Sequence, residues 1–202
     1  MDSTPKKRGR PREFDTTRAL LRARDTFLRF GYAGASIEEL ARAMELSKPS
    51  LYAAFGDKRS LYLRVLDERG RELGARFRAA FEKEKTLEAA VRAMLLAAVD
   101  AYLDDAEWPG CLLASAATTE APSDETIAEY ARRFFAVSDV RIASWILEKI
   151  PVCDRDAAPA LARLLNGVIH DLALRARIGE PRTKLREIAR DTARTVARFD
   201  SR

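Results

Sequence analysis

The apolar residues of the first 60 positions recur at helical spacing, and polar residues that favour helix ends stand between the runs. Asp15 can cap a helix over roughly residues 16–30, which Gly31 would end. Ser36 and Glu39 have the spacing of a capping box. The apolar positions behind this box follow an i, i+3, i+4, i+7 pattern: Ile37, Leu40, Ala41 and Met44. The pattern therefore predicts two helices with a break between them.

A third short helix is predicted directly after the second. Ser47 can cap this helix, and Pro49 falls in its first turn, where a missing N–H costs little. The helix must end near Gly56, after which Asp57 can cap a fourth helix that continues without an internal proline to about Glu84. The second and third helices are thus joined by a turn of about three residues.

The rest of the chain also follows helical spacing, with prolines at the breaks. Helices are predicted over residues 87–103, 110–118, 123–150, 154–178 and 181–199. Each of the last two has an apolar stripe, and we expect the stripes of two copies to form a four-helix dimer interface. They comprise Leu161, Leu165, Val168 and Leu172, and Leu185, Ile188, Thr192, Val196 and Phe199. The predicted fold class is all-α.

The excess positive charge of the chain lies entirely in its first third. Residues 1–64 carry 14 Lys and Arg against 8 Asp and Glu, whereas residues 65–202 carry 22 against 23. Basic side chains that neutralise phosphates release counterions and so give sequence-independent affinity for nucleic acid. We therefore expect a polyanion as the partner of the first third, which the helix arrangement below narrows to double-stranded DNA, and a different task for the remainder.

Two short helices joined by a tight turn have the form that the major groove of DNA admits. The second helix, here residues 48–55, would enter the groove while the first crosses the backbone. Leu51 and Phe55 would face inward. The side toward DNA would hold Lys48, Pro49, Ser50, Tyr52 and Ala53. Lys48 can donate to guanine and Tyr52 can reach a phosphate. The alternative interpretation is an ordinary amphipathic turn of a helical bundle.

Three motifs within residues 14–64 resemble the DNA-binding domain of TetR-family transcriptional regulators. They are F-x-x-x-G-Y at 27–32, S-I-E-E-L-A at 36–41 and L-S-K-P-S-L-Y-A-A-F-G-D-K at 46–58. The resemblance implies three base-facing residues, Lys48, Pro49 and Ser50, and three phosphate-contacting residues, Ser36, Tyr52 and Lys58. It also implies a helical-bundle domain for ligand binding and dimerisation over residues 65–202, and a dimeric repressor that a small molecule releases from DNA.

Glu45 departs from the family pattern, which usually has a glycine at the end of the second helix. A left-handed backbone at this position would cost a non-glycine residue roughly 1 kcal/mol. The turn is therefore expected either to be slightly strained or to differ in geometry.

Residues 1–13 are expected to form a flexible basic arm. The sequence R-G-R-P at positions 8–11 resembles the core of an AT-hook, whose arginines enter a narrow A·T minor groove. Arg8 and Arg10 are therefore candidate DNA contacts. A disordered solubilising tail is the alternative.

Six residues beyond position 64 are candidates to line a pocket for a small hydrophobic or aromatic effector, although each also suits a plain core. They are Met94, Tyr102, Trp108, Phe134, Trp145 and His170. Cys111 follows a Pro-Gly break near a predicted helix start, where a thiolate would be favoured. It is a candidate redox or electrophile sensor, and a small buried hydrophobic residue is the simpler interpretation.

Other function classes lack support in the sequence. Two cysteines without paired spacing and a single histidine give no Cys/His metal site, so neither metal nor cofactor is expected. No convergent nucleophile, base and metal-ligand motifs indicate an enzyme. A polar N-terminus and short apolar runs predict neither a signal peptide nor a membrane span, so a cytoplasmic location is expected.

The leading hypothesis is a homodimeric, ligand-responsive transcriptional repressor that binds a pseudo-palindromic operator. An effector-independent architectural DNA-binding protein and a repressor that senses electrophiles through Cys111 remain as alternatives.

Overall fold

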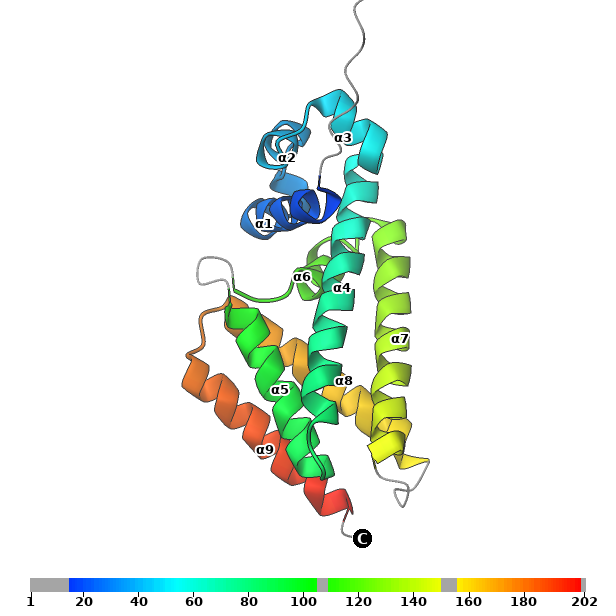
Figure 1. Ribbon diagram of the computed structural model, residues 1–202, viewed down its shortest axis with the longest axis vertical. Coiled ribbons are helices and arrows are strands. Elements are labelled where there is room, and N and C mark those ends of the chain that lie inside the picture. Colours follow the sequence, from blue (N-terminus) through cyan, green and yellow to red (C-terminus); the bar gives the residue numbers. More distant parts are fainter. Residues whose placement is uncertain (1–14, 105–108, 150–155, 201–202) are drawn as a thin grey trace, which may run out of the picture.

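The computed structural model describes residues 15–104, 109–149 and 156–200, and every regular element in these ranges is a helix (Figure 1). Three helices lie at one end of the molecule: α1 (Thr16–Gly34), α2 (Ile37–Ala43) and α3 (Lys48–Phe55). They adjoin the start of α4 (Lys58–Glu82), which runs through most of the length of the molecule (Figure 1). The predicted all-α fold is confirmed.

Local capping explains where these helices begin. The Asp15 carboxylate accepts hydrogen bonds from the backbone N–H groups of Thr17 and Arg18 at 3.0 and 3.2 Å. Ser36 and Glu39 form the reciprocal capping box that their spacing predicts. The side chains of Ser47 and Asp57 likewise accept from backbone N–H groups at the starts of α3 and α4. The predicted helix caps are thus confirmed, and each is made by Asp or Ser, residue types that are preferred at the N-cap.

The first helix differs from the prediction at its end. Gly31 has a left-handed φ of +71° and interrupts the helix, but helical structure resumes as far as Gly34. Tyr32, just after this kink, packs against the rings of Phe27 and Tyr62, and its ring centroid lies 4.8 Å from that of Tyr62. The extra turn therefore anchors the end of α1 on α4.

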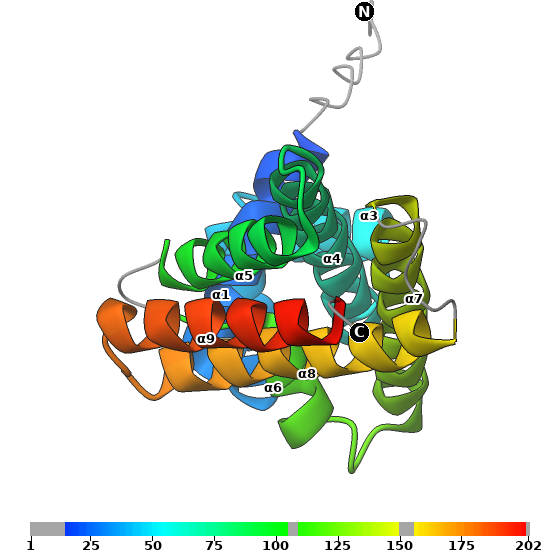
Figure 2. The same ribbon diagram turned by 90° about the horizontal axis from the view of Figure 1, so that it is seen from below.

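The remaining helices form a bundle around α4. They are α5 (Leu87–Leu103), α6 (Leu112–Thr119), α7 (Glu125–Lys149), α8 (Ala157–Arg177) and α9 (Arg182–Asp200). Figure 1 shows α7 on one side of α4 and α5 with α9 on the other. Figure 2 shows α9 lying against α5 and α8, and the short α6 contacts α1 as well as α4, α7 and α8. None of the described helices is long and apolar enough to cross a membrane.

The apolar stripes expected at a dimer interface lie largely inside the chain. Leu185 and Val196 of α9 are buried, and α9 packs extensively on α5 of the same chain. Leu165 and Leu172 of α8 are fully buried as well, whereas the side chain of Phe199 lies outside the described part. The expectation was wrong for these four residues because an amphipathic stripe shows which face is buried, but not which element covers it.

Candidate DNA-binding surface and ligand cavity

The short α3 is anchored on one side and open on the other. Leu51 and Phe55 are buried in the core, and the Arg64 guanidinium of α4 donates to the Ala54 carbonyl at 3.0 Å, near the end of α3. The predicted DNA-facing side is exposed along its whole length: Lys48, Pro49, Ser50, Tyr52 and Ala53. This arrangement presents the side chains that the sequence analysis assigned to DNA on a helix held rigidly from behind.

The turn between α2 and α3 has the left-handed backbone anticipated at Glu45, with φ of +56°. This is the sole non-glycine residue with positive φ in the described ranges. The Glu45 carboxylate pairs with Arg22 at 2.6 Å and with Arg18 at 3.1 Å, both on α1. The hydrogen bond and charge of Arg22 hold the pKa of this carboxyl below its usual value. The turn is therefore strained, and ion pairs to α1 accompany the strain.

Glycine at position 45 should relieve this strain. We expect Glu45→Gly to have a melting temperature roughly 2–4 °C above that of Glu45→Ala, since both lose the ion pairs but only alanine keeps the left-handed penalty. Thermal unfolding followed by circular dichroism checks the difference. Equal melting temperatures for the two variants would show that the backbone at Glu45 carries no strain.

Several predicted DNA contacts have partners within the protein. Lys48 pairs with the exposed carboxylate of Glu38 on α2. Lys58 lies over the Tyr32 ring, 4.6 Å from its centroid, and donates to the Ala33 carbonyl at 3.3 Å. The Ser36 hydroxyl is engaged with Glu39 in the capping box. When DNA binds, each of these side chains must either leave its partner in the protein or contact that partner and the DNA at the same time.

Arg8 and Arg10, the remaining predicted DNA contacts, lie outside the described residues.

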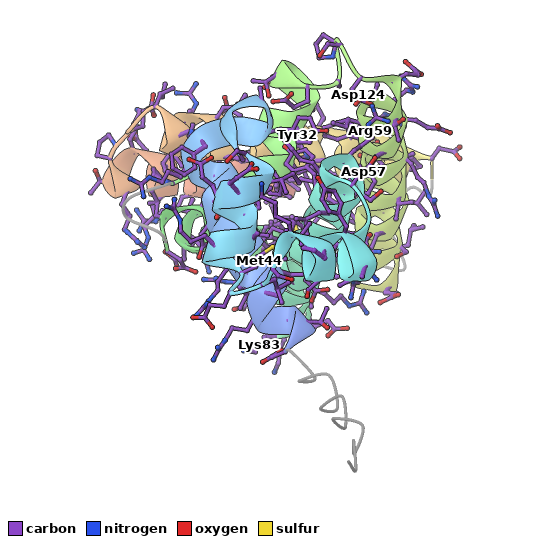
Figure 3. All side chains as sticks on the ribbon, turned by 90° about the horizontal axis from the view of Figure 1, so that it is seen from above. Tyr32, Met44, Asp57, Arg59, Lys83 and Asp124 are labelled. Atoms are coloured by element: carbon purple, nitrogen blue, oxygen red, sulfur yellow. The ribbon has the colours of Figure 1, made fainter. Side chains whose placement is uncertain are left out.

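Two polar contacts join the α1–α3 end of the molecule to the bundle. Arg59 of α4 pairs with Asp124, next to the start of α7, at 2.7 Å, and lies beside Tyr32 at the end of α1. Figure 3 shows Tyr32, Arg59 and Asp124 close together. Arg177, the last residue of α8, donates to the Leu28 carbonyl of α1 at 3.1 Å. The position of α1 is thus tied to α4, α7 and α8.

A cavity that is partly open to solvent lies between α4, α7 and α8. Four of the six predicted pocket residues line it: Tyr102, Phe134, Trp145 and His170. Met94 is fully buried and is not among the lining residues, and Trp108 lies outside the described residues. Arg69 and Arg141 also line the cavity, and neither could be predicted, because a charged residue on an amphipathic helix gives no signal of an inward position.

Cys111 also lines this cavity and stands at the N-cap of α6. Burial raises the pKa of its thiol, and the backbone N–H groups of Ala114 and Leu113 offset this in part. The protonated thiol is therefore favoured, as expected for a small buried side chain rather than a reactive thiolate. Cys153 lies outside the described residues.

His170 is held neutral at the cavity wall. Both of its ring nitrogens are buried without a hydrogen-bond partner among the described residues, and its ring meets that of Phe135 edge to face at 4.7 Å between centroids. Burial lowers the pKa of His170 to about 4, although the carboxylate of Asp139 acts in the opposite direction. The imidazole can therefore offer one donor and one acceptor to a ligand at neutral pH.

Acid should destabilise the protein through His170. The folded pKa lies below the unfolded value, so the unfolded chain takes up the proton first as the pH falls below about 6.5. We expect the wild type to lose about 2 kcal/mol more unfolding free energy between pH 7 and pH 5 than His170→Leu does. Urea unfolding at one fixed protein concentration measures this. Equal losses would contradict the neutral buried imidazole, and since the chain has one histidine, no other can mask the effect.

Comparison with known proteins identifies the architecture. A family model described as bacterial regulatory proteins, tetR family, matches residues 19–65. Over 196 residues the chain is 30% identical to the HTH-type transcriptional repressor ComR of Escherichia coli (strain K12), covering 94% of this chain and 92% of ComR. The chain belongs to the TetR family. The resemblance seen in the sequence motifs is therefore confirmed, and membership of a family of transcriptional regulators confirms that the chain is not an enzyme.

Other TetR-family proteins extend this likeness over the whole fold. The HTH-type transcriptional repressor BdcR of Escherichia coli (strain K12) is 25% identical over 171 residues, covering 85% of this chain and 83% of BdcR. A cysteine mutant of the regulator CifR, solved with 26-bp double-strand operator DNA, has a TM-score of 0.80 and 31% identity, covering 92% of this chain and 98% of CifR. The helix-turn-helix and the helical region behind it are thus both shared with TetR-family regulators.

Proposed function

We propose that this TetR-family regulator is a dimeric repressor that binds a pseudo-palindromic operator through α3, and that a small hydrophobic or aromatic effector in the cavity releases it. The observation that carries the proposal is the exposed side of α3, where Lys48, Ser50 and Tyr52 stand together on a helix anchored by Leu51 and Phe55. A solved complex of CifR with operator DNA and the repressor names of ComR and BdcR support it.

The residues on α3 and its neighbours are proposed to make two kinds of DNA contact. Lys48, Pro49 and Ser50 are proposed to read base edges, with Lys48 leaving Glu38 to donate to a guanine. Tyr52, Lys58 and Ser36 are proposed to contact phosphates, which fix the orientation of α3 but carry little sequence information. Arg8 and Arg10 of the basic arm would add contacts in the minor groove.

The exposed face of α8 is the proposed dimer interface. Leu164 is 67% exposed and Ile178 is 78% exposed, and helical geometry places them on the same side as Val168 and Leu174. A Cβ on Gly167 of this face would meet nothing within 4 Å, which leaves room for a second α8 to approach closely. Apolar side chains and a small residue, together with the Asp171–Arg175 ion pair at 2.7 Å on the same face, suit a self-complementary helix contact.

The contacts of α6 suggest how an effector would release DNA. Cys111 and Leu113 at the start of α6 line the cavity, and α6 also contacts α1. Dimeric helix-turn-helix proteins place their reading helices about 34 Å apart, one turn of DNA. A ligand that moves α6 would shift α1, and with it α3, away from this spacing. Such coupling requires only that the ligand bind the released arrangement more tightly.

The two alternatives are weaker on specific grounds. An electrophile sensor at Cys111 would need a thiolate, and burial raises the pKa of this thiol. An architectural protein has no need of an internal cavity with unpaired polar groups, such as that beside His170.

The affinity ratio between specific and random DNA tests the proposed function. Duplexes are first selected from a random pool with the full-length protein, and their affinity is then compared with that of scrambled duplexes at fixed salt. A regulator is expected to prefer the selected DNA at least about 1000-fold. A ratio near one would instead favour the architectural alternative and would overturn the proposal.

A further inference from the structure

Two glycines one helical turn apart on α4 make room for side chains of α7. A Cβ on Gly70 would lie 2.7 Å from a ring carbon of Phe134, and a Cβ on Gly74 would lie 2.9 Å from a guanidinium nitrogen of Arg141. Each glycine inside a helix costs about 1 kcal/mol relative to alanine, so a pair on one face needs a compensating role in packing. Here the pair lets Phe134 and Arg141 lie directly on the α4 backbone.

Both of these side chains also line the cavity, where the fixed charge is positive. Among the described residues that line it are two arginines, Arg69 and Arg141, and no carboxylate. Arg69 is already engaged, since it pairs with Glu72 at 2.7 Å and donates to the Ala101 carbonyl at 3.1 Å. Within the described ranges no carboxylate pairs with Arg141. Its guanidinium therefore remains available to an anion.

The approach to the cavity carries the same sign of charge. A groove between α4 and α7 shares Gly70, Phe134, Ser138 and Arg141 with the cavity. Its charged residues also include Arg133 and Arg71, against Asp67 alone, and Asp67 is paired with Arg71 at 3.3 Å. A positive groove that leads to an unpaired guanidinium attracts anions from solution.

The inner walls of the cavity are apolar, whereas its entrance is positively charged. They are formed by large apolar side chains, among them Leu73, Phe77, Ile142, Trp145 and Ile169. A ligand that satisfies both regions has an apolar body and a negatively charged end. A planar carboxylate suits the entrance because arginine can bind both of its oxygens at once.

We infer that the effector is an organic acid whose carboxylate pairs with Arg141 at the cavity mouth and whose apolar body fills the space between α4, α7 and α8. The inference rests on the proposed function for the role of the cavity as an effector site. It adds the chemical class of the ligand and names the residue that selects it.

Binding of matched acids and amides to the full-length dimer tests the inference. The probes are phenylacetate, indole-3-acetate and octanoate, each compared with its own amide by titration calorimetry at pH 7. We expect at least one acid to bind, and to bind about 10-fold more tightly than its amide, as a charged hydrogen bond predicts. Arg141→Gln should abolish this preference. The matched control is Arg132→Gln on the same helix, where Arg132 pairs with Glu125 instead, and it should keep the preference.

Three results would overturn the inference: no binding by any of the acids, equal or tighter binding of the amides, or a preference for acids that survives in Arg141→Gln. Affinity for the selected DNA, measured on the same preparations without probe, separates this failure from failure of the proposed function. If sequence-specific DNA binding is intact and any of the three results is found, only the inference of an organic-acid effector is rejected. If the wild type shows no sequence specificity for DNA, the proposed function itself is rejected.

Discussion

Leu164→Glu is expected to convert the proposed dimer into monomers and to lower operator affinity at least about 100-fold. Leu164 is 67% exposed in the single chain, on the α8 face where a second copy is proposed to bind. Two glutamates brought together there would repel each other and lose solvation. Each monomer would then hold only one half-site, and the gain of roughly 100-fold or more that linked binding provides would disappear. Sedimentation velocity and fluorescence anisotropy with selected DNA measure the two effects.

Val140→Glu provides the matched control for this experiment. Val140 is a 71% exposed apolar residue on α7, outside the proposed interface, so the same new charge should leave the dimer and its operator affinity unchanged. Dimers that persist in Leu164→Glu, or that dissociate equally in Val140→Glu, would reject the α8 face as the interface.

Lys48→Ala is expected to weaken operator binding by about 5-fold to 150-fold and to blur the choice of base at one position in each half-site. The loss corresponds to the 1–3 kcal/mol of discrimination that a good contact to a base edge supplies. Lys58→Ala should instead weaken binding to all sequences alike and reduce the slope of log affinity against log salt by about one. Anisotropy titrations against the selected duplex and its single-base variants, at several salt concentrations, distinguish the two patterns.

Two further variants show whether these losses are local. Lys83→Ala removes the same charge at the opposite end of α4 and should leave DNA affinity unchanged. Glu38→Gln removes the partner of Lys48 and should strengthen DNA binding, since the lysine no longer leaves an ion pair. Full base discrimination in Lys48→Ala would contradict the assignment of this residue to base reading.

The helix-turn-helix could be predicted from sequence because its information is local. Ser36, Ser47 and Asp57 mark helix starts within a few residues of the elements they cap, and the structure places a cap at each. The strain at Glu45 was predictable for the same reason, since a left-handed backbone at that position favours glycine. Gly31 predicted a break correctly but could not show that helical structure resumes beyond it.

The cavity and the interface depended on contacts between distant segments. Gly70 and Gly74 acquire a role only when α7 places Phe134 and Arg141 against them, more than 60 residues away in the chain. The stripe containing Leu185 was expected at a dimer interface, but in the structure α5 of the same chain covers it. Periodicity identifies a buried face, but the covering element follows from tertiary packing.

Hydroxyl-radical footprinting of the full-length protein on its selected DNA tests the central claim most directly. Two α3 helices in a symmetric dimer predict two protected patches related by two-fold symmetry, with centres about one helical turn apart, roughly 34 Å. A single patch, or continuous protection without symmetry, would contradict a dimeric regulator that reads DNA through α3.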